Sequence, residues 1–129
     1  MEEKRLIEIA KQAKEFSYSP YSGFRVGAAL LGGDGRVFTG CNIENCAYGP
    51  SNCAERTAIF KAVSEGCKRF KKIAIISDGE DYAFPCGVCR QVLAEFAPDI
   101  EILVANVNGF YVKTTLKQLL PNAFSLKEE

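Results

Sequence analysis

The stretch KKIAIISDGEDYAFPCGVCRQVL, residues 71–93, joins a strand, a loop and the start of a helix in one continuous run. Its first part, KKIAIISD, is a short β-branched run between charged flanks, which predicts a central strand. The loop DGEDYAFP follows, and we expect a helix to begin at about Cys86 or Gly87 and to end near Pro98. A strand that leads into a helix is the repeating unit of an α/β fold.

The segments on either side repeat this alternation. Apolar residues at helical spacing predict a helix over residues 3–16, and the turn GGDG at residues 32–35 separates two strands, FRVGAALLGG and RVFTGCN. A fourth strand, IEILVANV, is joined through Asn108-Gly109 to a fifth, FYVKT, and a short helix in TTLKQLLP precedes the tail NAFSLKEE. We therefore expect one domain over residues 1–129, with an α/β sheet covered on both faces.

One further helix is expected from about Cys53 to Glu65. Ser51 or Asn52 is the expected N-cap, because their side chains accept hydrogen bonds from free backbone N–H groups. Gly66 is the expected C-cap, since glycine readily adopts the backbone conformation that ends a helix. This helix therefore opens on the residues CAER.

The composition narrows the classes of function. Sixteen basic residues balance sixteen acidic ones, so the chain lacks the basic surplus of a polynucleotide binder, and a small-molecule partner is favoured. No apolar run approaches membrane-spanning length, and the charged start MEEKRLIEIAKQAKEF has no signal-peptide core, so we expect a cytoplasmic protein. In that compartment six cysteines indicate metal binding or reactive thiols rather than disulfides.

Three cysteines stand at expected helix starts. Cys86 and Cys89 form a C-x-x-C pair, which by itself is compatible with half a zinc site, a redox pair or two core cysteines. Cys53 occupies the equivalent place on the preceding helix. Consecutive strand–helix units in parallel arrangement place their helix N-termini along one edge of the sheet, so the three thiols can converge there. Three protein ligands with an open fourth position are typical of a catalytic zinc site, whereas closed four-ligand sites are structural.

Two charged residues, Glu55 and Arg56, stand two and three positions after Cys53. The chain has no histidine, so general-base work must fall to a carboxylate, and Glu55 is close enough to a metal at Cys53 to serve without ligating it. Three thiolates outweigh the charge of zinc and would keep a bound water poorly acidic. Arg56, with a second arginine, Arg90, after Cys89, can offset part of that excess.

The blocks YSGFRVGAAL, FTGCNIEN, PSNCAERTAIF, PCGVCRQVL and LLPNAF, taken together, resemble the small, homotetrameric, zinc-dependent cytidine deaminases that act on free nucleosides. The resemblance implies a three-layer α/β/α sandwich with a mixed five-stranded sheet and an antiparallel last strand. It also implies deamination of cytidine and 2′-deoxycytidine in pyrimidine salvage, with release of ammonia. The Asn108-Gly109 hairpin agrees, because in nucleic-acid editors of this superfamily the last strand tends to run parallel.

The resemblance assigns the residues of the metal centre. Cys53, Cys86 and Cys89 are expected to bind one Zn²⁺ per subunit. Glu55 is expected to take a proton from the activated water and to deliver it to N3 of the base and then to the departing amine. Arg56 is expected to compensate the charge of the thiolates.

The same resemblance assigns contacts to the nucleoside. Asn42 and Glu44 are expected to hydrogen-bond the ribose hydroxyls, Phe24 to pack against the pyrimidine, and the backbone of Ala54 to read the base edge. The family forms homotetramers whose sites borrow aromatic residues from neighbouring subunits. Tyr48 and Phe124 match those aromatic positions.

The sequence also allows other interpretations of these residues. The cysteines can be unligated core residues, Glu55 can stabilise the helix dipole, and Phe24 can be a strand core residue. Asn42 and Glu44 can be ordinary loop residues. A fourth thiol, from Cys46, would close the zinc site and make the protein a structural zinc module with an interaction role. Within the enzyme class, a deaminase of a nucleoside antibiotic such as blasticidin S shares the zinc motif.

Overall fold

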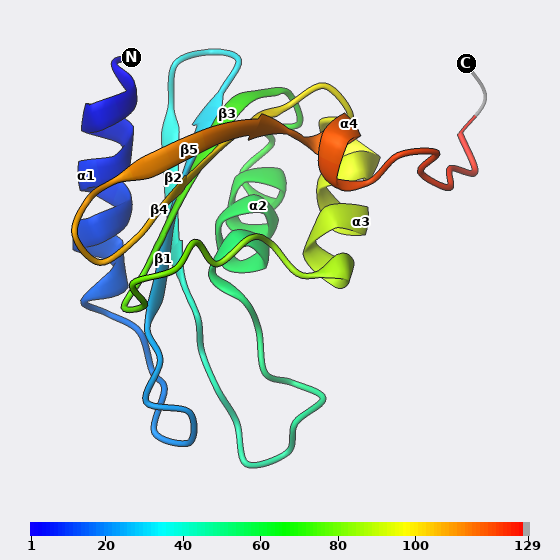
Figure 1. Ribbon diagram of the computed structural model, residues 1–129. Coiled ribbons are helices and arrows are strands. Elements are labelled where there is room, and N and C mark those ends of the chain that lie inside the picture. The colour runs from blue at the N-terminus through cyan, green and yellow to red at the C-terminus, as the bar shows by residue number, and fades with distance from the viewer. Residues whose placement is uncertain (128–129) are drawn as a thin grey trace.

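Five strands form one mixed sheet in the computed structural model, which describes residues 1–127 (Figure 1). Its strands are β1 (Val26–Gly32), β2 (Val37–Cys41), β3 (Phe70–Ser77), β4 (Glu101–Ala105) and β5 (Tyr111–Thr115), in the order β2-β1-β3-β4-β5. The last two residues of the predicted 1–129 domain, 128 and 129, lie outside the described residues.

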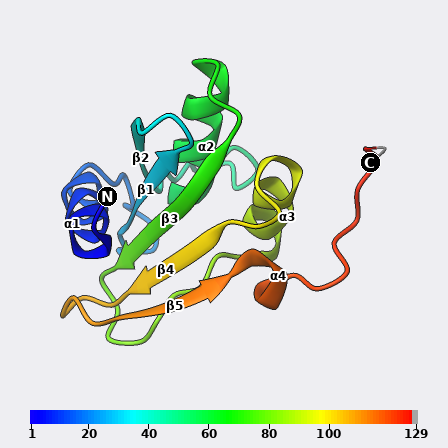
Figure 2. The same cartoon turned by 90° about the horizontal axis from the view of Figure 1, so that it is seen from above.

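Helices cover both faces of the sheet, as predicted. The helices are α1 (Glu3–Lys14), α2 (Ala54–Ser64), α3 (Gly87–Phe96) and α4 (Leu116–Leu119). Helix α1 lies on one face of the sheet, and α2 and α3 lie on the other (Figures 1 and 2). The three-layer α/β/α sandwich is therefore confirmed. No helix within residues 1–127 is long and apolar enough to span a bilayer.

The alternation of strand side chains builds two separate cores. Along β3, Ile73 and Ile75 face α2 and α3, whereas Ala74 and Ile76 face α1. All four side chains are almost completely buried. The near-continuous apolar run of β3 is typical of a strand that is covered on both faces, which is why this stretch predicts the layered fold.

The strand directions place two helix starts at one edge of the sheet. Both β2 and β3 pair antiparallel with β1, so they run in the same direction, and β3 pairs parallel with β4. Helix α2 follows β2 and helix α3 follows β3, so both helices begin at the lower edge of the sheet in Figure 1. The predicted hairpin at Asn108-Gly109 is also confirmed, because β4 and β5 are antiparallel and Gly109 has a φ of 83°.

The predicted caps of α2 are wrong by one or two residues. The N-cap is Cys53, with extended backbone, and neither Ser51 nor Asn52 caps the helix. Asn52 instead forms an isolated bridge with Ile43, which keeps the chain extended up to Cys53. At the other end the C-cap is Glu65, and Gly66 follows with a φ of 91°. The first helix likewise ends at Lys14 rather than at residue 16.

A glycine sets the close packing of α2 on the edge strand β2. A Cβ atom on Gly40 would lie 2.3 Å from the carbonyl oxygen of Ala54 and 2.6 Å from the backbone nitrogen of Ala58. Such distances are far inside van der Waals contact, so only glycine allows this approach. The first turn of α2 is thereby held directly against the sheet.

Candidate active site

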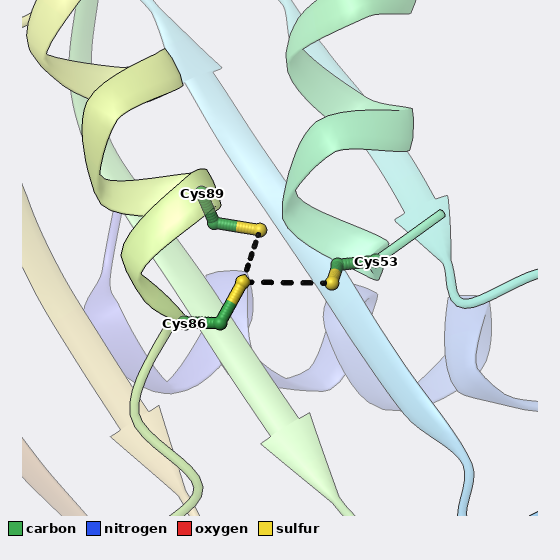
Figure 3. A group of neighbouring side chains, drawn as sticks. All are labelled: Cys53, Cys86 and Cys89. Atoms are coloured by element: carbon green, nitrogen blue, oxygen red, sulfur yellow. Dashed lines mark hydrogen bonds between the residues drawn. The ribbon is translucent and has the colours of Figure 1, made fainter. Parts of the chain in front are cut away.

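Three cysteines meet where α2 and α3 begin (Figure 3). Cys53 is the N-cap of α2, Cys86 is the N-cap of α3, and Cys89 lies in the first turn of α3. The Sγ atom of Cys86 lies 3.8 Å from that of Cys53 and 3.5 Å from that of Cys89. The predicted convergence of the three thiols is therefore confirmed.

The spacing of the sulfur atoms suits a tetrahedral zinc ion. Zinc–sulfur bonds of about 2.3 Å in a tetrahedron place the sulfur atoms about 3.8 Å apart, and the three Sγ atoms all lie within 4.8 Å of one another. Thiolate is the ligand that zinc prefers when histidine is absent. The set of three thiols therefore fits a zinc ion.

Cys46 does not complete this group. Within residues 1–127 the cluster that could hold a metal contains Cys53, Cys86 and Cys89 alone. Cys46 is exposed on the preceding loop, with its thiol 3.8 Å from the side-chain oxygen of Asn45. A metal held by these three thiols alone would keep its fourth position open, which is the catalytic pattern.

Arg56 is bonded to one of the thiols. Its Nη2 atom donates to Sγ of Cys53 at 3.2 Å. The hydrogen bond from Cys89, together with that from Arg56, lowers the pKa of the Cys53 thiol to about 5 although burial opposes this. The same contact to Cys53, with burial, raises the pKa of Cys89. Cys53 therefore ionises before Cys89, and a metal bound at Cys89 would have to displace the proton of that thiol.

Arg90, the arginine that follows Cys89, does not contact the thiols in this way. Its Nε atom donates to the carbonyl of Pro85 and its Nη1 atom to the carbonyl of Leu119, both at 2.8 Å. Arg90 thus fastens the loop before Cys86 to the end of α4. The two arginines occupy similar places in the sequence, but only Arg56 is turned toward the sulfur atoms.

Glu55 is almost completely buried, with 5% of its surface exposed, and it lines the cavity beside the thiols. Burial raises the pKa of its carboxyl to about 7, and the charge of Cys53 contributes to this increase. A carboxyl group with a pKa near neutrality can both accept and donate a proton at physiological pH. A first-turn acid that only stabilised the helix dipole would instead be favoured in its charged form.

A cavity of about 440 Å³ opens at this edge of the sheet. The volume lies within the usual range of small-molecule sites. Eight of the residues predicted from the sequence line it: Asn42, Glu44, Tyr48, Cys53, Ala54, Glu55, Arg56 and Cys86. Cys89 is fully buried and does not line the cavity.

Asn42 and Glu44 are bonded to the loop between α1 and β1. The Asn42 amide donates to the carbonyl of Phe24 at 2.8 Å and accepts from the backbone N–H of Val26 at 2.9 Å. One carboxylate oxygen of Glu44 accepts from the backbone N–H groups of Tyr21 and Ser22, at 3.0 and 3.1 Å. Both side chains therefore have a structural role that the sequence did not reveal, and both line the cavity as well.

Two predicted aromatic contacts are not among the residues that line the cavity. The ring of Phe24 lies against Gly79, where an added Cβ would be 3.3 Å from it. Phe124 belongs to the C-terminal tail, which runs past α3 and away from the sheet (Figure 1), and it is 68% exposed. Its carbonyl accepts a hydrogen bond from Gln91.

Further residues line the cavity that were not predicted from the sequence. Ala83 and Phe84, in the loop before Pro85, line it opposite α2, and Val26 contributes from β1. The position of Phe84 two residues before Cys86 is the signal that could have identified it. A residue so close to a ligand at a helix start must lie near the rim of the site.

Comparisons with known proteins agree with this geometry. Residues 1–105 match the family model for the cytidine and deoxycytidylate deaminase zinc-binding region. The chain is 50% identical over 129 residues to a cytidine deaminase of Sporosarcina psychrophila, covering 99% of this chain and 95% of the relative. A solved structure of cytidine deaminase from Burkholderia pseudomallei superposes with a TM-score of 0.93 at 47% identity, covering 96% of this chain and all of the other. Blasticidin-S deaminase of Bacillus cereus is 35% identical, covering 90% of this chain and 87% of the relative.

Proposed function

Because the chain belongs to the family of zinc-binding cytidine and deoxycytidylate deaminases, we propose that it hydrolyses cytidine and 2′-deoxycytidine to uridine and 2′-deoxyuridine, with release of ammonia. One observation carries this proposal. Three thiols at tetrahedral spacing stand beside a buried carboxyl group in a cavity large enough for a nucleoside. The ligand set Cys53, Cys86 and Cys89 leaves room for a water molecule and a substrate.

The protein's own groups supply the proton transfers. Bound zinc supplies a Lewis acid that activates water for attack at C4 of the pyrimidine. Glu55 transfers two protons from the attacking water in turn, the first to N3 of the base and the second to the leaving amine. Its pKa of about 7 suits both transfers. Arg56 stabilises the negative charge on Cys53 through its hydrogen bond.

The nucleoside is proposed to lie along the cavity, with its base toward Glu55 and its sugar toward the segment that follows the C-terminal end of β2. Asn42 and Glu44 line that end and bind the ribose hydroxyls. The backbone of Ala54, the first residue of α2, reads the base edge. Phe24 approaches the pyrimidine from the loop before β1, although its ring does not line the cavity of the isolated chain.

We further propose that the active form is a homotetramer whose sites are shared between subunits. Tyr48 is 86% exposed and Phe124 is 68% exposed, so both side chains are free to contact a neighbouring subunit. Phe124 does not line its own chain's cavity, so it is assigned to that of a neighbouring subunit. A cytoplasmic role in pyrimidine salvage accords with this substrate class and with the balanced charge of the chain.

A blasticidin-S deaminase is the nearer alternative, since one such relative covers most of the chain. The higher identity to the cytidine deaminase of Sporosarcina psychrophila favours cytidine. A comparison of kcat/KM for cytidine and for blasticidin S separates the two activities. A structural zinc module is disfavoured because Cys46 lies outside the thiol cluster.

The proposal is tested by measuring zinc content and ammonia release together. Wild type should contain one zinc per chain and convert cytidine to uridine, and a strong chelator should abolish the conversion. Glu55→Gln should keep its zinc and lose activity by a factor of about 10²–10⁴. A variant that keeps zinc and deaminates as fast as wild type would refute the role of Glu55. X-ray absorption that reports four sulfur ligands would favour the structural module.

A further inference from the structure

The segment between α1 and β1 folds into a loop beside the cavity. The backbone N–H of Gly23 donates to the carbonyl of Ser19 at 2.9 Å, and Gly23 has a φ of 67°. Tyr18 forms an isolated bridge with Ile43 on the chain that leaves β2. The loop is therefore held against the segment that carries Glu44, although the two are far apart in the sequence.

The carboxylate of Glu44 is oriented entirely by this loop. Its Oε1 atom accepts from the backbone N–H groups of Tyr21 and Ser22, and its Oε2 atom accepts from the Ser22 hydroxyl at 2.5 Å. The hydrogen bond from that hydroxyl, assisted by the two backbone donors, lowers the pKa of Glu44. Ser22 thus supplies the one side-chain donor among the three that fix the carboxylate.

The same hydroxyl holds a second partner. The backbone N–H of Phe24 donates to Oγ of Ser22 at 3.0 Å. The Ser22 oxygen therefore donates to Glu44 and accepts from Phe24 at the same time. Only a hydroxyl group offers a donor and an acceptor on one atom at this position, whereas alanine offers neither and a thiol is weak in both respects.

Ser22 does not line the cavity, whereas Glu44 does. Its influence on a bound nucleoside must therefore pass through the residues that it holds. Glu44 faces the proposed sugar end of the cavity, and Phe24 belongs to the proposed base contact. A single oxygen atom links the two parts of the proposed substrate site.

We propose that Ser22 is a positioning residue for sugar recognition, which holds the Glu44 carboxylate in the orientation that binds the ribose hydroxyls. The inference rests on the proposed function, because it takes a nucleoside to be the ligand. It goes beyond that function by assigning sugar selectivity to a residue outside the cavity. The bond to Phe24 keeps the same hydroxyl fixed in the loop.

Two ligands that differ only in the sugar hydroxyls test this assignment. The dissociation constants of uridine and 2′,3′-dideoxyuridine are measured by titration calorimetry on the zinc-loaded wild type and on Ser22→Ala. Uridine should bind the variant about tenfold more weakly, since Glu44 loses its side-chain donor. The dissociation constant of dideoxyuridine, which has no hydroxyl for Glu44 to bind, should change less than twofold.

Companion variants distinguish positioning from general damage. Ser22→Thr keeps the hydroxyl and should bind uridine within about threefold of wild type. Ser22→Cys is nearly the same size as serine, and it should reproduce the selective loss even if the alanine variant folds poorly. Ser64→Ala removes a hydroxyl that donates to the carbonyl of Lys61 at the far end of α2, and it should change neither constant. In a Glu44→Ala background, the further change Ser22→Ala should alter the dissociation constant of uridine by less than twofold.

Several results would overturn the inference. Equal weakening of both ligands in Ser22→Ala and Ser22→Cys would mean that the loop is merely structural. Unchanged uridine binding in both variants would mean that the backbone donors suffice for Glu44. The deaminase assay is separate, so a wild type that binds uridine selectively but releases no ammonia would refute the proposed function and leave this inference standing.

Discussion

Arg56 donates a hydrogen bond from Nη2 to Sγ of Cys53, at 3.2 Å, across one turn of α2. The contact holds a positive charge beside the Cys53 thiol and helps to lower the pKa of that thiol. Zinc binding requires ionised thiols, so the arginine links the charge of the site to its affinity for metal.

Replacing Arg56 by glutamine should make zinc retention more sensitive to acid. Without the guanidinium, the pKa of Cys53 rises from its value of about 5, and protons compete better with zinc. We expect the pH at which half the zinc is lost to increase by about one unit, in line with the usual effect of residues that support metal ligands. Zinc content after dialysis between pH 5 and pH 8 measures this.

Arg90→Gln is the matched control, because Arg90 follows Cys89 but bonds to two backbone carbonyls. It should lower thermal stability and leave the pH of zinc loss within a few tenths of a unit. If the two variants lost zinc at the same pH, the specific role of Arg56 would be wrong.

Gly40→Ala should destabilise the fold and also damage the metal site. The new Cβ would lie 2.3 Å from the carbonyl oxygen of Ala54, so α2 must move away from β2 and carry Cys53 with it. We expect a loss of about 1–3 kcal/mol in the free energy of unfolding, together with reduced zinc content. Denaturant unfolding and metal analysis give the two quantities.

Gly27→Ala provides the comparison on the opposite face. Its Cβ would lie 2.1 Å from the carbonyl oxygen of Ala10, which displaces α1 rather than α2. A similar loss of stability with full zinc content is expected. Loss of zinc in both variants to the same degree would show that the effect is not specific to the start of α2.

Asp78→Asn should lower the free energy of unfolding at neutral pH and make that free energy less dependent on pH in the acid range. Although burial opposes it, hydrogen bonds from Arg25 and Lys14 lower the pKa of Asp78 to about 2. The pKa is lower in the folded chain than in the unfolded chain, so Asp78 stabilises the fold above about pH 4 and this contribution is lost as the pH falls toward 2. The partial exposure of the pair limits the effect to about 1–2 kcal/mol.

Urea unfolding at pH 7, 4 and 2.5 measures that difference, which should shrink steadily as the pH falls. Asp99→Asn serves as the control, because its bridge to Lys117 lies on an exposed surface. The free energy of unfolding of Asp99→Asn should stay within about 0.5 kcal/mol of the wild-type value at each pH. A constant deficit of Asp78→Asn at all three values would argue against an electrostatic cause.

Two defective chains should restore activity when they are combined. The Glu55→Gln chain lacks the proposed proton carrier but keeps Phe124. The Phe124→Ala chain keeps Glu55 but lacks the aromatic side chain. If Phe124 completes the site of a neighbouring subunit, mixed oligomers contain sites with both residues. Activity after co-expression should then exceed the summed activities of the two variants by severalfold.

Light scattering should report a mass four times the 14.2 kDa of the chain for the wild type and for the mixture. The pair Glu55→Gln and Glu55→Ala, co-expressed in the same way, should show no gain. Additive activity from the first mixture in an intact tetramer would place Phe124 outside the shared site.

Local residue patterns were enough to predict the helices and strands and the chemistry available to the site. The apolar runs of β3 and β4 and the Asn108-Gly109 turn predicted the strands and the last hairpin, because side-chain periodicity and turn geometry depend on neighbouring residues. The absence of histidine left thiols for a metal and a carboxylate for a base. Cys53, Cys86 and Glu55 were therefore identifiable before any distance was known.

The tertiary structure alone decided which of these groups meet. Cys53 and Cys86 are 33 residues apart, and they come together because β2 and β3 both pair antiparallel with β1 and send their helices from one edge. Cys46 lies on the exposed loop before α2 and outside the cluster, and the N-cap of α2 is Cys53, directly after the bridge residue Asn52. Such placements depend on packing between distant segments, which local periodicity does not encode.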